Sequence, residues 1–206
     1  ICCIAFVMAA CHNCAHLQSP DGTISLDFRL DEQGTPMYHV TKDGQLILDW
    51  SKLGIVSQEY DLTHAFTITH TTTNTVNTSW ETVWGEERTI SDQHNELIIA
   101  LKHQSGLKMK IAFRMYNDGL AFRYIFPKQS PKPLTITDEI TEYRFVSDHQ
   151  AWSIPWLTEY YEALWDKAPL SQKDTMCSPI TLELTNGGYA FVHEAALYDY
   201  PAQNLY

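Results

Sequence analysis

The chain has 206 residues, of which 44% are hydrophobic and 12% aromatic, so it can bury one substantial core of sandwich size. Its formal net charge of -11 argues against nucleic acids and anionic lipid head groups as partners, because like charges repel. No apolar run approaches the roughly 20 residues that a membrane-spanning helix needs. We therefore expect one folded domain whose ligands are neutral or cationic.

The first eighteen residues have the character of a leader rather than of a folded segment. Residues 1–10 are apolar and predict the core of a secretory signal peptide whose basic start is missing. Residues 8–11 resemble a bacterial lipobox, which predicts a lipid on Cys11, with ordinary cleavage near Ala15 as the alternative. Cys11 and Cys14 have Cys-x2-Cys spacing, but Cys2 and Cys3 are adjacent, so the early cysteines lack the two such pairs of a zinc site. We expect an exported domain that covers residues 19–206.

A hydrophobic period of two begins at Gly22 and predicts β-strands. Residues 24–30 alternate most clearly, with Ile24, Leu26 and Phe28 on one side and polar residues on the other. Residues 66–73 are rich in threonine, which suits an exposed sheet face. The strands predicted in this way cover residues 24–30, 37–40, 46–50, 66–73, 96–103, 107–116, 120–126, 134–137, 143–146, 180–184 and 189–193.

Two turn motifs predict antiparallel hairpins. Asn117-Asp118-Gly119 lies between two alternating segments, and we expect a glycine with positive φ there. Asn186-Gly187-Gly188 is a second turn motif whose residues tolerate positive φ, and it lies between the predicted strands 180–184 and 189–193. Helical periodicity of ordinary length is missing, although residues 159–164 could form one turn. Many short strands without alternating helices predict an all-β fold, an antiparallel β-sandwich.

Residues 83–88 form the first candidate site. Trp84 offers an apolar ring face and Glu86 a carboxylate, the pair of groups that grips a sugar. The alternative is a strand end at which Trp84 packs in the core while Glu86 and Glu87 pair with Arg88.

His193 and Glu194 form a second candidate site at the end of a predicted strand. The imidazole could donate to a sugar hydroxyl and the carboxylate could accept from one. The alternative is a buried histidine that its neighbour satisfies.

Taken together, residues 83–88, 117–119, 148–160 and 193–197 resemble the N-terminal β-sandwich of glycoside hydrolase family 97, the α-glucosidases and α-galactosidases of Bacteroidetes. That resemblance implies a supersandwich like that of galactose mutarotase. It also implies that Trp84, Glu86, His193 and Glu194 bind an oligosaccharide or α-glycoside. Glu159 would help to hold a calcium ion, with Glu162 as a competing assignment.

In the family, the catalytic carboxylates and most calcium ligands lie on a (β/α)8 barrel that follows the sandwich. The resemblance therefore implies a partner barrel missing from this chain, no catalytic residues here, and a fragment that is inactive alone. It further implies the periplasm or outer membrane of a Gram-negative bacterium. Calcium takes six to eight oxygen ligands, so Glu159 can supply only a fraction of a site.

Two rival functions stay open. One is a free-standing carbohydrate-binding module or surface lipoprotein, which would use the same groups without hydrolysis. The other is an aldose epimerase, which needs an acid and a base across one sugar. His193 and Glu194 would be that pair, although sequence neighbours are poorly placed to act on opposite sides of a substrate.

Overall fold

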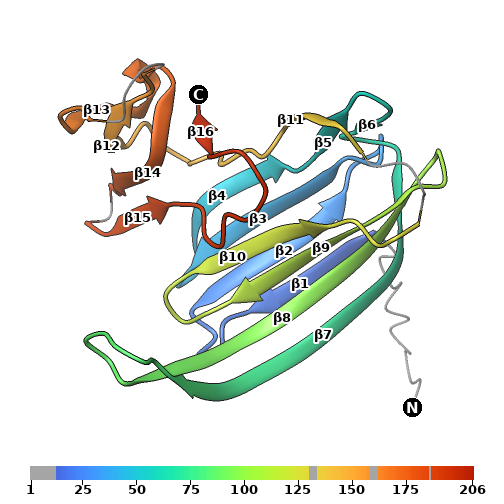
Figure 1. Ribbon diagram of the computed structural model, residues 1–206, viewed down its shortest axis with the longest axis horizontal. Coiled ribbons are helices and arrows are strands. Elements are labelled where there is room, and N and C mark those ends of the chain that lie inside the picture. The colour runs from blue at the N-terminus through green and yellow to red at the C-terminus, as the bar shows by residue number, and fades with distance from the viewer. Residues whose placement is uncertain (1–12, 130–133, 158–161, 186) are drawn as a thin grey trace, which may run out of the picture. The chain divides into compact units, whose positions relative to one another are not determined.

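The computed structural model describes residues 13–129, 134–157, 162–185 and 187–206, and divides the chain into two compact units, Ile1–Arg144 and Phe145–Tyr206. The first unit contains most of the strands (Figure 1). Its strands are β1 (Cys14–Gln18), β2 (Ile24–Leu30), β3 (Pro36–Lys42), β4 (Gln45–Lys52), β5 (Ile55–Ser57), β6 (Asp61–Leu62), β7 (Phe66–Glu81), β8 (Thr89–His103), β9 (Lys108–Met115), β10 (Leu120–Ile125) and β11 (Ile136–Glu139).

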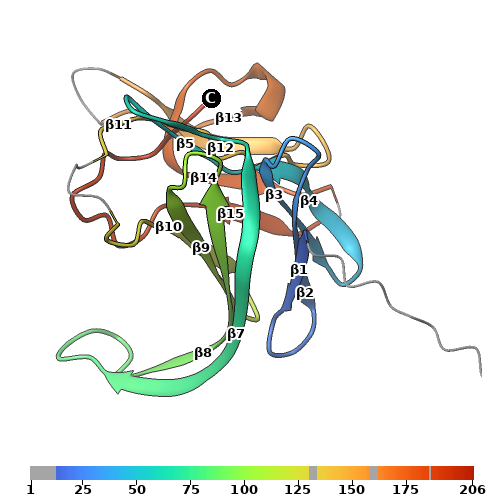
Figure 2. The ribbon, with the colours of Figure 1, turned by 90° about the vertical axis from the view of Figure 1, so that its right-hand side faces the viewer.

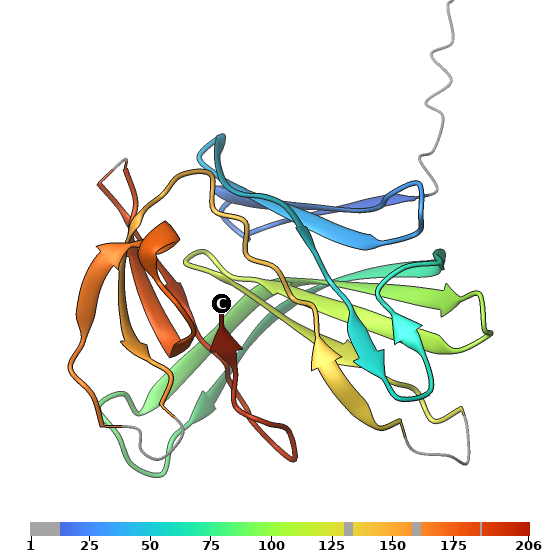
Figure 3. The same cartoon turned by 90° about the horizontal axis from the view of Figure 1, so that it is seen from above.

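Two antiparallel sheets form the first unit's sandwich, one in the order β1-β2-β3-β4 and the other in the order β10-β9-β8-β7. Figure 3 shows them as two layers, blue to cyan above green. Phe113 lies at their centre, with its ring 6.1 Å from the rings of Phe28 and Tyr38 in the opposite sheet. These contacts confirm the predicted all-β sandwich, and a small sheet in the order β11-β5-β6 adds to the unit.

The alternation in β2 sets which of its faces enters this core. Leu26 and Phe28 are completely buried, whereas Arg29 is exposed on the other face. Because successive strand residues point to opposite faces, a strict period of two allows burial on one side only. The predicted strand 24–30 is therefore confirmed residue for residue.

The hairpin of β7 and β8 is longer than the sequence predicts. Residues 66–73 and 96–103 were expected, but the pairing continues from Phe66 opposite His103 to Glu81 opposite Thr89. Most of β7 is exposed, and β7 is the edge strand of its sheet. Figure 2 shows the hairpin curving away from the rest of the sheet. Backbone pairing continues there without a buried face, so no hydrophobic alternation marks it.

Both predicted hairpins form, with residue 186 of the second turn outside the described residues, and a positive φ at glycine is found in one of them. Gly187 has φ 88° between β14 and β15. Gly119 does not have a positive φ, which corrects the expectation for that turn. The connection has four residues, and Tyr116 N donates to Gly119 O at 2.8 Å. Asn117 Oδ1 instead accepts from Asp21 N at 3.1 Å, so this side chain joins two turns of the sandwich.

The second unit is built on the antiparallel sheet β13-β12-β14-β15, with β16 paired to β14. One face of this sheet is buried through Ala151, Leu182 and Val192. The elements are β12 (Gln150–Pro155), β13 (Asp166–Pro169), a 3-10 helix (Leu170–Gln172), β14 (Met176–Glu183), β15 (Tyr189–Val192) and β16 (Asn204–Leu205).

Several strand predictions need correction. Residues 143–146 form no strand apart from an isolated bridge at Phe145, while β1, β5, β6, β12, β13 and β16 were missed. The possible helical turn at 159–164 falls partly on residues 158–161, outside the described residues, and residues 162–164 are not helical. Within the part of the chain that the structure describes, no helix is long and apolar enough to cross a membrane.

Candidate functional site

The loop that joins β7 to β8 carries the first predicted pair. Trp84 is 89% exposed, and Glu86 is exposed beside it. The loop is closed by Thr82, whose N donates to Arg88 O at 2.9 Å and whose Oγ1 donates to Glu87 O at 2.7 Å. The hairpin thus presents an indole ring and a carboxylate to solvent on a hydrogen-bonded loop.

The alternative interpretation of this loop is wrong on two points. Trp84 does not enter the core, because nearly all of its surface is accessible. The guanidinium of Arg88 pairs with Glu81 across the hairpin at 3.3 Å, and not with Glu86 or Glu87. Such an exposed ion pair contributes little to stability. Because Arg88 pairs with Glu81, the carboxylate of Glu86 stays available for hydrogen bonds from a ligand.

His193 and Glu194 follow β15 in the second unit, and they contact different groups. His193 is exposed, and its Nδ1 lies 3.0 Å from Ser178 Oγ. Glu194 Oε2 accepts a hydrogen bond from Gln203 N at 2.9 Å. The alternative of a buried histidine satisfied by its neighbour is therefore wrong. These contacts hold both side chains in place while the imidazole stays accessible to solvent.

The predicted residues thus form two local groups. Trp84 and Glu86 share the hairpin loop of the first unit, and His193 and Glu194 share the end of β15 in the second. Glu159 lies outside the described residues, as does Cys11. Among the residues with described positions, no three histidine, cysteine or carboxylate side chains are arranged to hold a metal ion.

Asp148, which begins the family-like segment 148–160, has a structural role. Its carboxylate accepts from Ser171 N at 2.8 Å and from Ser171 Oγ at 2.7 Å, which fixes the 3-10 helix. These two hydrogen bonds lower the pKa of Asp148 from its usual value, because they stabilise the ionised carboxylate. The carboxylate of Asp148 thus anchors the 3-10 helix.

The sheet β10-β9-β8-β7 carries a polar row, of which the sequence reasoning did not identify Asp92 and His94. His94 is 1% exposed, and its Nδ1 lies 2.7 Å from Asp92 Oδ1. Arg114 Nε donates to Glu96 Oε1 at 3.1 Å on the adjacent strand, and this bond raises the pKa of Arg114. The ring of Tyr116 lies 4.9 Å from that of His94. The signal was available, since Asp92, His94 and Glu96 occupy alternate positions of one strand.

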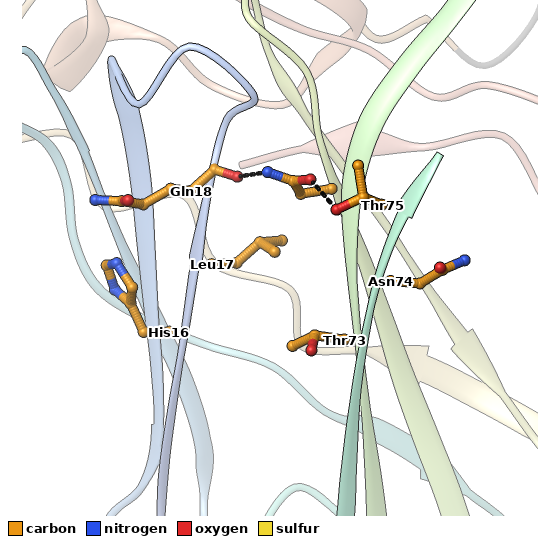
Figure 4. Close-up of a pocket in the computed structure, with 7 residues that line it drawn as sticks. His16, Leu17, Gln18, Thr73, Asn74 and Thr75 are labelled. Carbon is orange, nitrogen blue, oxygen red and sulfur yellow. Dashed lines mark hydrogen bonds between the residues drawn. The ribbon is translucent and has the colours of Figure 1, made fainter. Parts of the chain in front are cut away.

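An open hollow of about 400 Å³ lies between β1 and the β7–β8 hairpin (Figure 4). Asn95 crosses it, donating through Nδ2 to Gln18 O at 2.9 Å and accepting from Thr75 Oγ1 at 2.8 Å. Its amide therefore ties the two sheets together at their edge. The hollow is lined by His16, Leu17, Gln18, Thr73, Asn74, Thr75 and Asn95. This lining lacks the opposed carboxylates that glycoside cleavage requires.

Comparison with known proteins gives the family. The family model described as Glycosyl-hydrolase 97 N-terminal matches residues 17–206. The chain belongs to this family. Among curated relatives, it is 23% identical to a retaining alpha-galactosidase of Bacteroides thetaiotaomicron over 92% of this chain and 30% of the relative. It is 25% identical to a probable retaining alpha-galactosidase of Streptomyces bingchenggensis over 80% of this chain and 25% of the relative.

Solved structures agree with the fold. A family 97 glycoside hydrolase from Pseudoalteromonas sp. strain K8, in complex with panose, superimposes with a TM-score of 0.87 at 33% identity, over 92% of this chain and 30% of that one. The same enzyme with acarbose gives the same values. A beta-arabinopyranosidase at 24% identity shares the fold with a TM-score of 0.82, over 89% of this chain and 32% of that one. The chain thus spans less than a third of the length of these proteins.

Proposed function

We propose that this chain is the carbohydrate-binding N-terminal part of an exported, calcium-dependent glycoside hydrolase that acts on α-glucosides or α-galactosides. The observation that carries the proposal is the family match over residues 17–206, in a chain that spans 30% of an alpha-galactosidase. The named activity of that relative and the sugar complexes of the Pseudoalteromonas enzyme support the substrate class.

In this proposal the domain completes an active site and does not perform the cleavage. Hydrolysis of a glycoside needs two carboxyl groups roughly 5 to 9.5 Å apart on either side of the bond. Glu86 and Glu87 are neighbours in a loop, and Glu194 is bonded to the backbone at Gln203. These residues do not form such a pair. As the resemblance to family 97 implies, we expect the catalytic pair on a (β/α)8 barrel that follows this domain.

Trp84, Glu86, His193 and Glu194 are proposed to contact the sugar. The exposed indole can cover the apolar face of a pyranose ring, while the exposed Glu86 accepts from its hydroxyls. The accessible imidazole of His193 adds a donor or acceptor. Removal of such contacts should raise KM and leave kcat nearly unchanged, because they bind ground state and transition state alike.

Glu159 is proposed as one oxygen ligand of calcium. A hard cation with six to eight oxygen ligands cannot be held by one carboxylate, so the remaining ligands are expected from the barrel. Calcium added to this chain alone should consequently bind weakly, whereas the assembled enzyme should bind it tightly.

A chimaera tests the proposal. This chain would replace the corresponding 30% of the Pseudoalteromonas enzyme, and nitrophenyl α-glucoside and α-galactoside hydrolysis would be measured with and without calcium. We expect activity in the chimaera, and a KM about tenfold higher for Trp84→Ala, a loss of roughly 1.4 kcal/mol of binding. Glu159→Gln should raise the calcium concentration that half-maximal activity requires.

Two results would contradict it. Turnover by this chain alone that disappears on Glu86→Gln or Glu194→Gln would place the catalytic groups within it. A folded chimaera without activity would exclude the active-site role.

For export, labelled palmitate incorporated at Cys11, and lost in Cys11→Ser, would support the lipoprotein leader over ordinary cleavage.

A further inference from the structure

The two faces of the sheet β13-β12-β14-β15 differ in a way that the proposed function does not use. One face is buried, whereas the other leaves large rings in solvent: Trp152 is 38% exposed, Phe191 63% and Tyr189 71%. Large exposed apolar groups gathered on one face are informative, while scattered ones are not. We call Trp152, Tyr189, Phe191, Lys167 and Glu183 the aromatic face.

Strand register places these residues on the same side. Thr181 of β14 lies opposite both Trp152 of β12 and Phe191 of β15, so the two rings flank a small side chain. Neighbouring strands lie about 4.8 Å apart, which sets the two rings roughly 10 Å from each other. Each ring can therefore contact a different unit of one short oligosaccharide laid across the strands.

Two polar groups beside the rings are held in fixed positions. Glu183 lies on β14, between the two aromatic strands, and Lys167 lies on β13, on the other side of Trp152. Trp152 Nε1 donates to Glu183 Oε1 at 2.9 Å, and Lys167 Nζ lies 2.7 Å from Glu183 Oε2. The Lys167 ammonium also lies 5.2 Å from the Trp152 ring centroid. Bonds from Lys167 first, and then from Trp152, lower the pKa of Glu183, so it stays ionised in mild acid. The indole is thereby oriented before any ligand arrives.

Charge and solvation favour a sugar over a protein as the occupant. The ammonium and carboxylate neutralise each other, so the face has no excess charge with which to select an ion. Glu183, on the strand between the rings, and Lys167, on the strand beyond Trp152, nevertheless remain 30% and 38% exposed. Protein interfaces are depleted of charged residues at their centre, because desolvating them is costly. A polyhydroxylated ligand can instead replace the displaced water with hydrogen bonds from its own hydroxyls.

We propose that the aromatic face binds a neutral oligosaccharide, with Trp152 and Phe191 against the apolar faces of two sugar units and Glu183 and Lys167 bonded to their hydroxyls. The exposed Tyr189 extends the platform along β15. The choice of ligand rests on the proposed function, since a domain of a glycosidase meets saccharides. Trp84 and Glu86 take no part in this site.

The experiment measures binding of maltoheptaose and of an α-galactoside tetrasaccharide to the chain by calorimetry. Affinity electrophoresis in gels with amylopectin or galactomannan provides a second readout. Trp152→Ala and Phe191→Ala should each weaken binding about tenfold, equivalent to roughly 1.4 kcal/mol. Trp152→Phe, which keeps a ring, should lose less. The matched control is Tyr198→Ala, because Tyr198 is 82% exposed in the same unit but outside the sheet.

The outcomes separate this inference from the proposed function. Binding that Trp84→Ala weakens and Trp152→Ala leaves intact would overturn the inference, as would no binding by the chain. Concentration-dependent dimers that Phe191→Ala dissociates would instead make the face a contact between copies. The chimaera assay does not depend on Trp152. An inactive chimaera would therefore contradict the proposed function, whereas weaker saccharide binding by the Trp152→Ala variant would still support the aromatic face as a binding site.

Discussion

Tyr124 offers the sharpest test of how the first unit is held together. Its hydroxyl accepts from Gly54 N at 3.1 Å and lies 2.9 Å from Thr141 Oγ1. Thr141 gives its single hydroxyl proton to Glu139 Oε1 at 2.6 Å, so the phenol must be the donor to Thr141. One hydroxyl thus satisfies a buried backbone N–H of one loop and bonds a side chain of another.

Tyr124→Phe removes both bonds and leaves the buried Gly54 N–H without its partner. An unsatisfied buried donor costs about 1–3 kcal/mol, and that is the expected loss in the free energy of unfolding. Urea denaturation followed by circular dichroism measures it, with an unchanged m-value if only the native state is affected. Tyr189→Phe, at a ring 71% exposed, is the matched control and should change stability by less than about 0.5 kcal/mol.

Double-mutant analysis adds a second check. Thr141→Val removes the other end of the phenol's donor bond, so the losses for the two substitutions should not add. A Tyr124→Phe protein that is less than about 0.5 kcal/mol weaker than the parent would refute the reasoning, because Gly54 N would then have found another acceptor at no cost.

Burial raises the pKa of Tyr38 and of Tyr124 in the folded protein. The stability that the two protonated phenols contribute is therefore complete below the unfolded pKa of about 10 and is lost as the pH rises above it. Urea denaturation at a series of pH values should show the free energy of unfolding falling above about pH 10. Gly34→Ala, at φ 75°, should cost clearly more than Gly44→Ala at φ 76°, because only its Cβ would meet backbone atoms at 2.7 Å; chemical denaturation compares the two. Asp148 has a lowered pKa, so its contribution is complete above the unfolded value of about 4 and is lost as pH falls through the lower native value. The stability difference between the parent and Asp148→Asn should therefore shrink as the solution is acidified below about pH 4.

The sequence predicts the strands of the fold where one face is buried. Residues 24–30 alternate because Leu26 and Phe28 enter the core while the residues between them do not. The outer halves of β7 and β8 carry no such pattern, since neither face is buried along most of β7. Their pairing depends on backbone bonds, which are the same for every side chain, and residue types therefore could not reveal its length.

The candidate sites show a similar division. The sequence identified Trp84 and Glu86 as a candidate sugar-binding pair. The residues around Trp84 in the sequence were nevertheless compatible with either a buried or an exposed indole. Only the extended hairpin settles that Trp84 is 89% exposed. Trp152 and Phe191 were not connected at all, because they lie on strands far apart in sequence that β14 brings to one face.

Aromatic residues have opposite uses in the two units. In the first unit, Phe28, Tyr38 and Phe113 are fully buried between the sheets, where each such ring contributes roughly 1.5–3 kcal/mol to folding. In the second unit, Trp152 and Phe191 leave much of their surface in water and contribute correspondingly less to folding. Because Glu183 fixes the exposed indole, the ring loses little further freedom when a ligand arrives. Apolar area that contributes less to the fold is thus kept in a form suited to a saccharide. Removal of the more exposed ring, Phe191, should therefore weaken binding and cost less unfolding free energy than removal of a fully buried ring such as Phe113.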